Sequence, residues 1–225
     1  MGSAEGAVFR PPASASIDVM WVRGAAIRPV PRYAIVPASM LEDIERELAD
    51  DSPRSREELD GAFARFESSQ PHLADCVSQV LSRPLDETAL ALGYFLSISI
   101  FLAFERSFGE ARLRQVSADS LEATEQAIAL EEELRAAHGD EPLDLDDVVS
   151  IEQPHVLSFV HEHVDAALEP GSGEVATDAE GAEPHEVDVD DVHGVYRAVV
   201  LLTLCLSHAV IPVDGAARGR DELMA

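Results

Sequence analysis

The chain has 225 residues, a net charge of −27 and 46% hydrophobic residues, which is typical of a folded protein with a sizeable core. A surface this acidic repels nucleic acid and anionic lipid, so we expect neither as a partner. All sixteen basic residues are Arg, and the lack of Lys excludes Schiff-base lysines, phosphate-loop lysines and lysine general bases.

Residues 1–38 are predicted to form an extended arm, because they contain five prolines and no helical periodicity. The alternation around Val19 predicts a short strand, and Tyr33–Val36 is a candidate for a second. The arm carries a charge of +2 and the rest of the chain −29. Aromatic and Arg side chains are enriched in interfaces, which makes part of the arm a candidate interaction surface. The candidate interaction residues are Trp21, Arg23, Arg28, Arg32 and Tyr33.

The helical domain is predicted to span 39–213, followed by a polar tail at 214–225. Capping-box spacing marks helix starts at Ser39 and Ser55. A later helix is expected to begin at Ser117 or Asp119 and to end at Gly139. After it comes an acidic linker, with a possible helical turn near Asp146–Ser150.

A duplicated helical hairpin is the main architectural prediction, with copies at about 70–108 and 153–210. The tripeptide Gln-Pro-His opens both copies, at Gln70 and at Gln153, and the apolar positions after it match when moved along by 83. Proline suits the first helical turn, and each glutamine is predicted to accept hydrogen bonds from free amides of its own helix start. The fold class is therefore expected to be an all-α bundle of about six helices. A pseudo-twofold axis is expected to relate the two copies.

The connection inside the second copy differs from the short one in the first. Residues 169–188 are rich in Gly, Pro, Glu and Ala and have no apolar periodicity. Such a segment buries too little surface to offset the entropy lost on ordering, so it is predicted to be disordered and dispensable.

The uncharged runs Thr88–Phe104 and Ala198–Ile211 are expected to be core helices rather than membrane spans. The N-terminus lacks the pattern of a signal peptide, which favours a cytoplasmic location. Cys76 and Cys205 lie in apolar helical stretches and are read as buried hydrophobic residues, so neither a disulfide framework nor a cofactor is expected.

A metal-dependent helical-bundle enzyme is one alternative function, because Glu152 and His155 have Glu-x-x-His spacing and His161 lies further along the same helix. The first copy lacks the matching residues, so this is the weaker reading. The candidate ligands are Glu105, Glu152, His155 and His161.

The function favoured by the sequence is a non-enzymatic helical interaction module that binds another protein or its own subunits. No nucleophile motif or Gly-rich phosphate loop precedes a helix, which weakens catalytic alternatives. An acidic mimic of nucleic acid is a further alternative, but mimicry needs acids in ordered rows, whereas many of these acids lie in the predicted loop.

Overall fold

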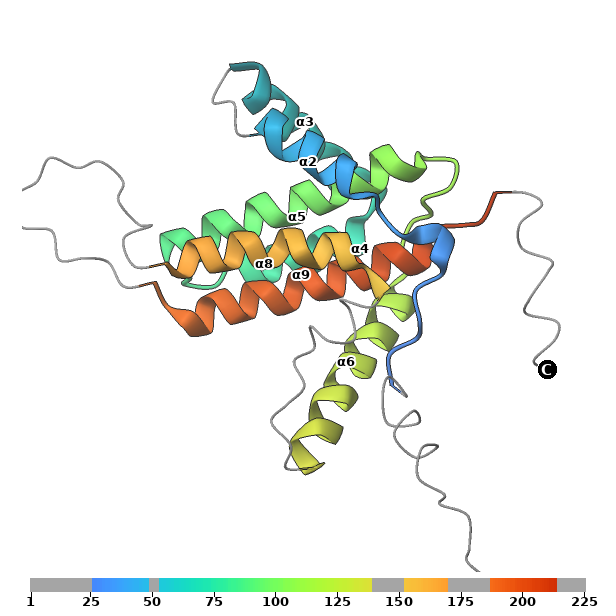
Figure 1. Cartoon of the computed structure of the whole chain (residues 1–225), viewed down its shortest axis with the longest axis vertical. Coiled ribbons are helices and arrows are strands. Elements are labelled where there is room, and N and C mark those ends of the chain that lie inside the picture. Colours follow the sequence, from blue (N-terminus) through green and yellow to red (C-terminus); the bar gives the residue numbers. More distant parts are fainter. Residues whose placement is uncertain (1–25, 49–52, 139–151, 170–186, 214–225) are drawn as a thin grey trace, which may run out of the picture.

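The computed structural model describes residues 26–48, 53–138, 152–169 and 187–213. Within these ranges the regular structure is helical, so the predicted all-α class is confirmed (Figure 1). The elements are the 3-10 turn η1 (Arg32–Ala34) and the α-helices α2 (Ala38–Leu48), α3 (Pro53–Ser69), α4 (Pro71–Leu81), α5 (Glu87–Phe108), α6 (Ala118–His138), α8 (Pro154–Leu168) and α9 (Val189–Ala209). The seven α-helices described are one more than expected.

Helices α5 and α9 form the central pair of the bundle and run in the same direction. Their first residues lie together, since the backbone N–H of Asp188 donates to Asp86 Oδ2 at 3.0 Å. Further along, a Cβ on Gly93 would lie 3.3 Å from the Cγ atoms of Val195, so the absence of a side chain permits this close approach. By length and composition both helices are also candidate membrane spans, but here most of the residues in their apolar windows are buried.

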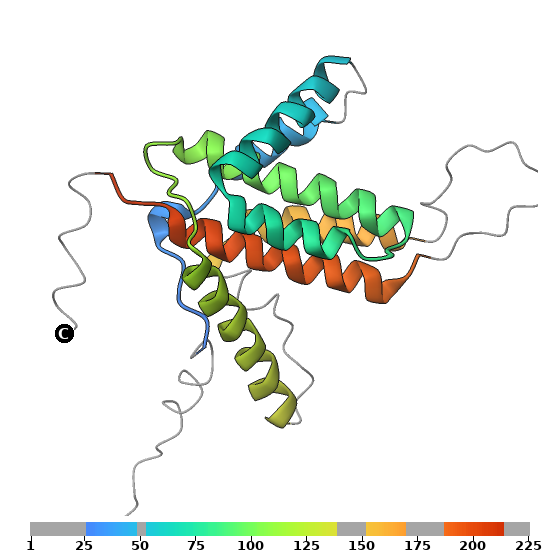
Figure 2. The same ribbon diagram turned by 180° about the vertical axis from the view of Figure 1, so that it is seen from behind.

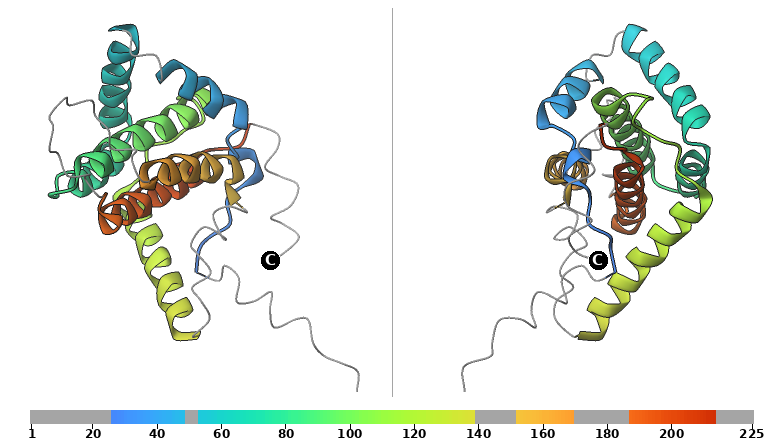
Figure 3. Two further views of the ribbon diagram at one scale, coloured as in Figure 1. Left: turned by 60° about the vertical axis from the view of Figure 1, so that its left-hand side comes forward. Right: turned by 90° about the vertical axis from the view of Figure 1, so that its right-hand side faces the viewer.

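Helix α4 lies antiparallel to α5 and α8 antiparallel to α9, and these four helices form the bundle seen nearly end-on in Figure 3. Helix α2 packs against α5 and α8, whereas α6 packs against α9 and α4. Helices α2 and α3 project from one side of the bundle and α6 from the other, as Figures 1 and 2 show. Helices α2 and α6 therefore each contact both hairpins, whereas α3 packs on α4 and α5 of the first hairpin.

The helix ends follow local chemistry in most places. Asp86 caps α5, accepting from the N–H of Ala89 at 2.9 Å, and Gly109 follows that helix with a φ of 68°. Ser117 caps α6 as predicted, since its Oγ accepts from the N–H of Ser120 at 3.2 Å. The two predicted capping boxes were slightly misplaced, because α2 begins at Ala38 and α3 at Pro53.

The candidate strand at Tyr33–Val36 is not formed. Arg32–Ala34 is a 3-10 turn, and the residues after it run extended without a partner strand. In the described part of the chain, β-type pairing is limited to one antiparallel bridge between Leu113 and Val210. The predicted strand around Val19, the turn near 146–150 and residues 170–186 of the predicted loop lie outside the described residues.

Candidate interaction site

The second part of the predicted arm, residues 26–37, lies against the bundle. Four of its apolar side chains are at most 6% exposed: Ile27, Val30, Ala34 and Val36. Between them, Arg28, Arg32 and Tyr33 are exposed. This part of the arm therefore has a buried apolar face and an exposed face that carries two cations and an aromatic ring.

Two polar side chains from distant positions hold the start of this segment through its backbone. Glu152, just before α8, accepts a hydrogen bond from the N–H of Val30 at 2.7 Å. His208, near the end of α9, lies with Nε2 3.0 Å from the carbonyl oxygen of Arg28. Because a carbonyl only accepts, Nε2 is assigned as the protonated nitrogen.

Gln153 holds the end of the segment with both atoms of its side-chain amide. Its Nε2 donates to the carbonyl of Ala34 at 2.7 Å, and its Oε1 accepts from the N–H of Val36 at 3.2 Å. Nε2 also lies 2.8 Å from Ser207 Oγ, inside the core. The amide thus pairs with a carbonyl and an N–H two residues apart, much as a neighbouring strand would.

The predicted role of the two glutamines as caps of their own helices is wrong. Neither Gln70 nor Gln153 makes a side-chain hydrogen bond to the helix that follows it. Gln70 instead donates from Nε2 to the carbonyl of Arg114 at 3.0 Å and accepts at Oε1 from the N–H of Val116 at 2.9 Å. Both side chains bond to the backbone of extended segments that are distant in the sequence. The N–H and carbonyl groups of these segments need partners where they are buried.

Arg112 is a site residue that sequence reasoning missed. Its guanidinium donates to the carbonyl of Tyr33 at 3.3 Å and to that of Ile211 at 3.0 Å, and it lies 5.1 Å from the ring centre of Phe108. It therefore connects the arm to the segment that follows α9. No local sequence pattern marks it, since its partners are backbone atoms of distant segments.

The environment of His208 disfavours its charged form. Burial lowers its pKa below the usual value, and the positive charge of Arg28 acts in the same direction. The carbonyl of Arg28 and the carboxylate of Glu152 oppose this effect without overcoming it. The neutral imidazole is thus the form that suits the docked arm.

Of the predicted interaction residues, three lie in the described part of the chain and share the docked segment. Arg28, Arg32 and Tyr33 are on its exposed face, and Tyr33 is 42% exposed. Trp21 and Arg23 lie outside the described residues.

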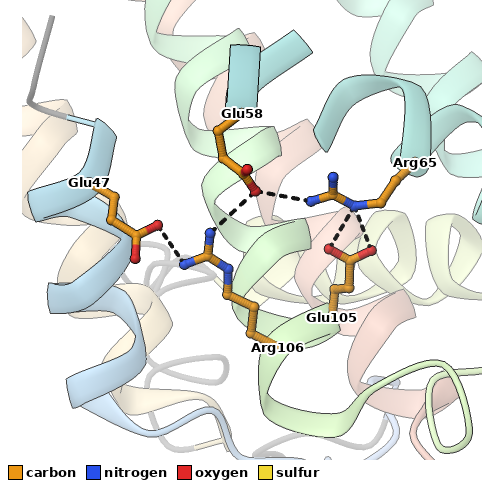
Figure 4. A network of polar contacts seen from close by, with 5 residues as sticks. All are labelled: Glu47, Glu58, Arg65, Glu105 and Arg106. Atoms are coloured by element: carbon orange, nitrogen blue, oxygen red, sulfur yellow. Dashed lines mark hydrogen bonds and ion pairs between the residues drawn. The ribbon is translucent and has the colours of Figure 1, made fainter. Parts of the chain in front are cut away.

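Three of the four predicted metal ligands, Glu105, Glu152 and His161, have other partners. Glu105 accepts two hydrogen bonds from Arg65 Nε, at 3.1 and 3.2 Å. These two residues belong to a chain of ion pairs that joins α2, α3 and α5 (Figure 4). The further contacts in it are Arg65–Glu58 at 3.4 Å, Arg106–Glu58 at 3.5 Å and Arg106–Glu47 at 2.8 Å.

Glu152 binds the arm, His161 stacks on Tyr196 with ring centres 5.9 Å apart, and His155 is exposed. Among the residues that the structure describes, no group of three or more His, Cys, Asp or Glu side chains is placed to hold a metal ion. The described residues therefore contain no ligand cluster for the metal-dependent enzyme that was considered from the sequence.

An apolar groove of about 460 Å³ lies between α3 and α5. Phe63 and Tyr94 meet in it with ring centres 6.1 Å apart, and Tyr94 is 47% exposed. Asp60 is the acidic residue in its lining. The groove is therefore an exposed apolar region separate from the arm, because it lies on α3 and α5.

Comparison of the chain with protein-family models, with curated proteins and with solved structures found no match. The residues of the site are therefore the basis for inferring a function.

Proposed function

We propose that this protein is a non-enzymatic helical interaction module, and that the exposed face of the docked arm is its contact surface. The observation that carries the proposal is the way the arm is held. Its backbone is fixed by Glu152, Gln153 and His208, so its inward side chains and its main chain are already engaged. Arg28, Arg32 and Tyr33 point to the other side.

A surface held in this way is suited to binding. Residues that are fixed before a partner arrives lose less conformational entropy on association. Arg and Tyr are also residue types that interfaces favour. The two cations stand out on a chain of net charge −27, so the fitting partner presents an acidic surface.

The bundle of a second copy of this chain presents such an acidic surface. We therefore propose that the chain forms a homo-oligomer through this contact. The proposed location is the cytoplasm, and the proposal involves no cofactor.

The test is sedimentation of the full-length chain over a range of concentrations, with the double variant R28E/R32E beside it. At one fixed salt concentration we expect the wild type to self-associate, because Arg28 and Arg32 would pair with acidic residues of the second copy. The double variant is expected to remain monomeric. Its backbone contacts with Glu152 and Gln153 do not depend on the replaced side chains, so its fold should be unchanged.

Arg83→Glu is the matched control, because Arg83 is also exposed but lies at the end of α4. It changes the charge by the same amount per residue and is expected to leave association intact. Equal loss of association in the control would show that net charge matters rather than the arm surface. A wild-type chain that stays monomeric at every concentration would overturn the homo-oligomer.

A further inference from the structure

A longer repeat than the hairpin is visible once the glutamine contacts are known. The segments held by the two glutamines are Ala34–Val36 and Arg114–Val116, and each leads directly into an outer helix. The residues that recur 80 positions later are Val36, Ala38, Leu41, Glu42 and Glu45, matched by Val116, Ala118, Leu121, Glu122 and Glu125. Helices α2 and α6 thus begin with related sequences.

The two glutamines hold these segments crosswise. Gln153, in the second hairpin, takes the segment that precedes α2, whereas Gln70, in the first hairpin, takes the segment that precedes α6. The bonded atoms correspond one to one: Nε2 donates to the carbonyl of the first residue, and Oε1 accepts from the N–H of the third. Both glutamine side chains are essentially inaccessible, at 0% and 1% exposed.

The outer helices cross over in the same manner. Glu45 of α2 faces α8, with its Oε1 3.7 Å from His163 Nε2. The matching Glu125 of α6 faces α4, with its Oε1 3.9 Å from Cys76 Sγ. Each outer helix therefore also packs on the inner helix that the other hairpin supplies.

The twofold axis of this arrangement lies between the central helices α5 and α9. The capping residues Asp86 and Asp188 are 102 positions apart, and so are Gly93 and Val195, which approach each other in the middle of the pair. Asp86 and Asp188 are also in contact, at 3.0 Å. Residues that correspond and also touch are what a twofold axis between two parallel helices produces.

We propose that residues 34–108 and 114–210 are two halves in which α2, α4 and α5 correspond to α6, α8 and α9, whereas α3 has no counterpart among the described residues. A pseudo-twofold axis relates the two sets of helices, and each half holds the leading segment of the other. The interaction surface is the crossed glutamine clamp together with the inner helices α8 and α4, on which α2 and α6 of the other half pack. The partner that fits it is the other half of this chain, in the way that subunits of a domain-swapped dimer fit one another.

The test uses the full-length chain carrying a protease recognition sequence between Glu110 and Ala111, two exposed residues that lie between the halves. The folded protein is cut with the protease, and its molar mass is then measured by light scattering under native conditions. We expect the two pieces to stay together at the mass of the intact chain, and to reform that 1:1 complex after unfolding in urea and dilution. We also expect each piece on its own to lack stable structure, because its clamp and outer helix would have no partner.

Pieces that separate after cutting and each remain folded would overturn the proposal, since side-by-side halves behave in that way. A second measurement compares Gln70→Leu with Gln153→Leu in the cut protein, with Gln79→Leu as the control on the exposed side of α4. Each clamp variant is expected to weaken the association of the pieces by about tenfold or more, because it leaves two backbone groups without partners. A Gln70 variant that behaves like the Gln79 control would show that the two clamps are not equivalent, and would also refute the proposal.

Discussion

At the scale of single residues, a few polar side chains decide how distant segments meet. Gln153 and Glu152 satisfy three backbone groups of the arm between them, and His208 satisfies a fourth. The two backbone groups that Gln153 satisfies are buried, and an unpartnered buried backbone group costs about 1–3 kcal/mol. The apolar residues of the arm supply most of the buried area, and the polar ones determine its register.

The docked arm should loosen as the pH falls, because the half-buried His208 packs against it in its neutral form. Its pKa is lowered in the folded chain, so the unfolded chain takes up the proton first, and stability is lost as the pH falls through about 6.5. Glu152 and Arg28 are the charged groups whose effects act on it in opposite directions. We expect melting temperatures measured at pH about 7.5 and about 5.5 to differ more in the wild type than in His208→Asn.

The variant serves as the reference because protonation of the many carboxylates changes stability in both proteins alike. An identical pH dependence in the two proteins would show that His208 does not couple to arm docking.

At the scale of elements, the docked arm behaves as part of the core. A chain that begins at Ser39 would lose four buried side chains and leave Gln153 without its two backbone partners. We therefore expect it to be markedly less stable, since each fully buried Val or Ile contributes about 1.5–3 kcal/mol.

Urea unfolding followed by circular dichroism measures this loss. A chain that begins at Ala26 is the control, because it keeps the docked residues and their buried contacts. If the chain that begins at Ser39 were as stable as the control, arm docking would contribute nothing to the fold.

The connection between α8 and α9 is expected to be dispensable. Residues 169–188 connect α8 to α9, whereas the matching helices α4 and α5 are joined by a short connection. Long surface connections add little to the free energy of folding. A deletion of residues 170–186 that joins Glu169 to Val187 through a short turn should leave the melting temperature within a few degrees of the wild type. The caps at Asp86 and Asp188 must be retained in the design, because Asp188 N–H bonds to Asp86. A large drop in the melting temperature would show that the connection is packed.

At the scale of the whole molecule, the dominant feature is charge. With a net charge of −27 the folded chain repels itself, and the ion pairs of Figure 4 involve only a few of its 43 acidic residues. Salt shortens the range of this repulsion to about 10 Å at 0.1 M. We expect the melting temperature to rise from low to high NaCl, and to rise with sulfate as well. An unchanged melting temperature would mean that the ion pairs lost to screening offset the repulsion that is relieved.

The sequence by itself determined the all-α class, the places where α4, α5, α8 and α9 begin, and the central position of the two longest apolar helices. These features follow from local causes: a proline in the first turn, Asp86 as a cap, Gly109 at a helix end, and a lack of charge along a helix. The repeated glutamines were visible in the sequence as a signal, although their partners were not.

Only the tertiary structure decided what those glutamines hold and which side of the arm is buried. An amide side chain can pair with its own helix start or with any extended backbone, and burial beside Ala34 and Arg114 makes the second choice favourable. The same reason explains Arg112, whose partners are carbonyls far away in the chain. It also explains Glu105 and Glu152: the spacing that indicated metal ligands is compatible with an ion pair to Arg65 and a hydrogen bond from Val30, and packing supplied those partners.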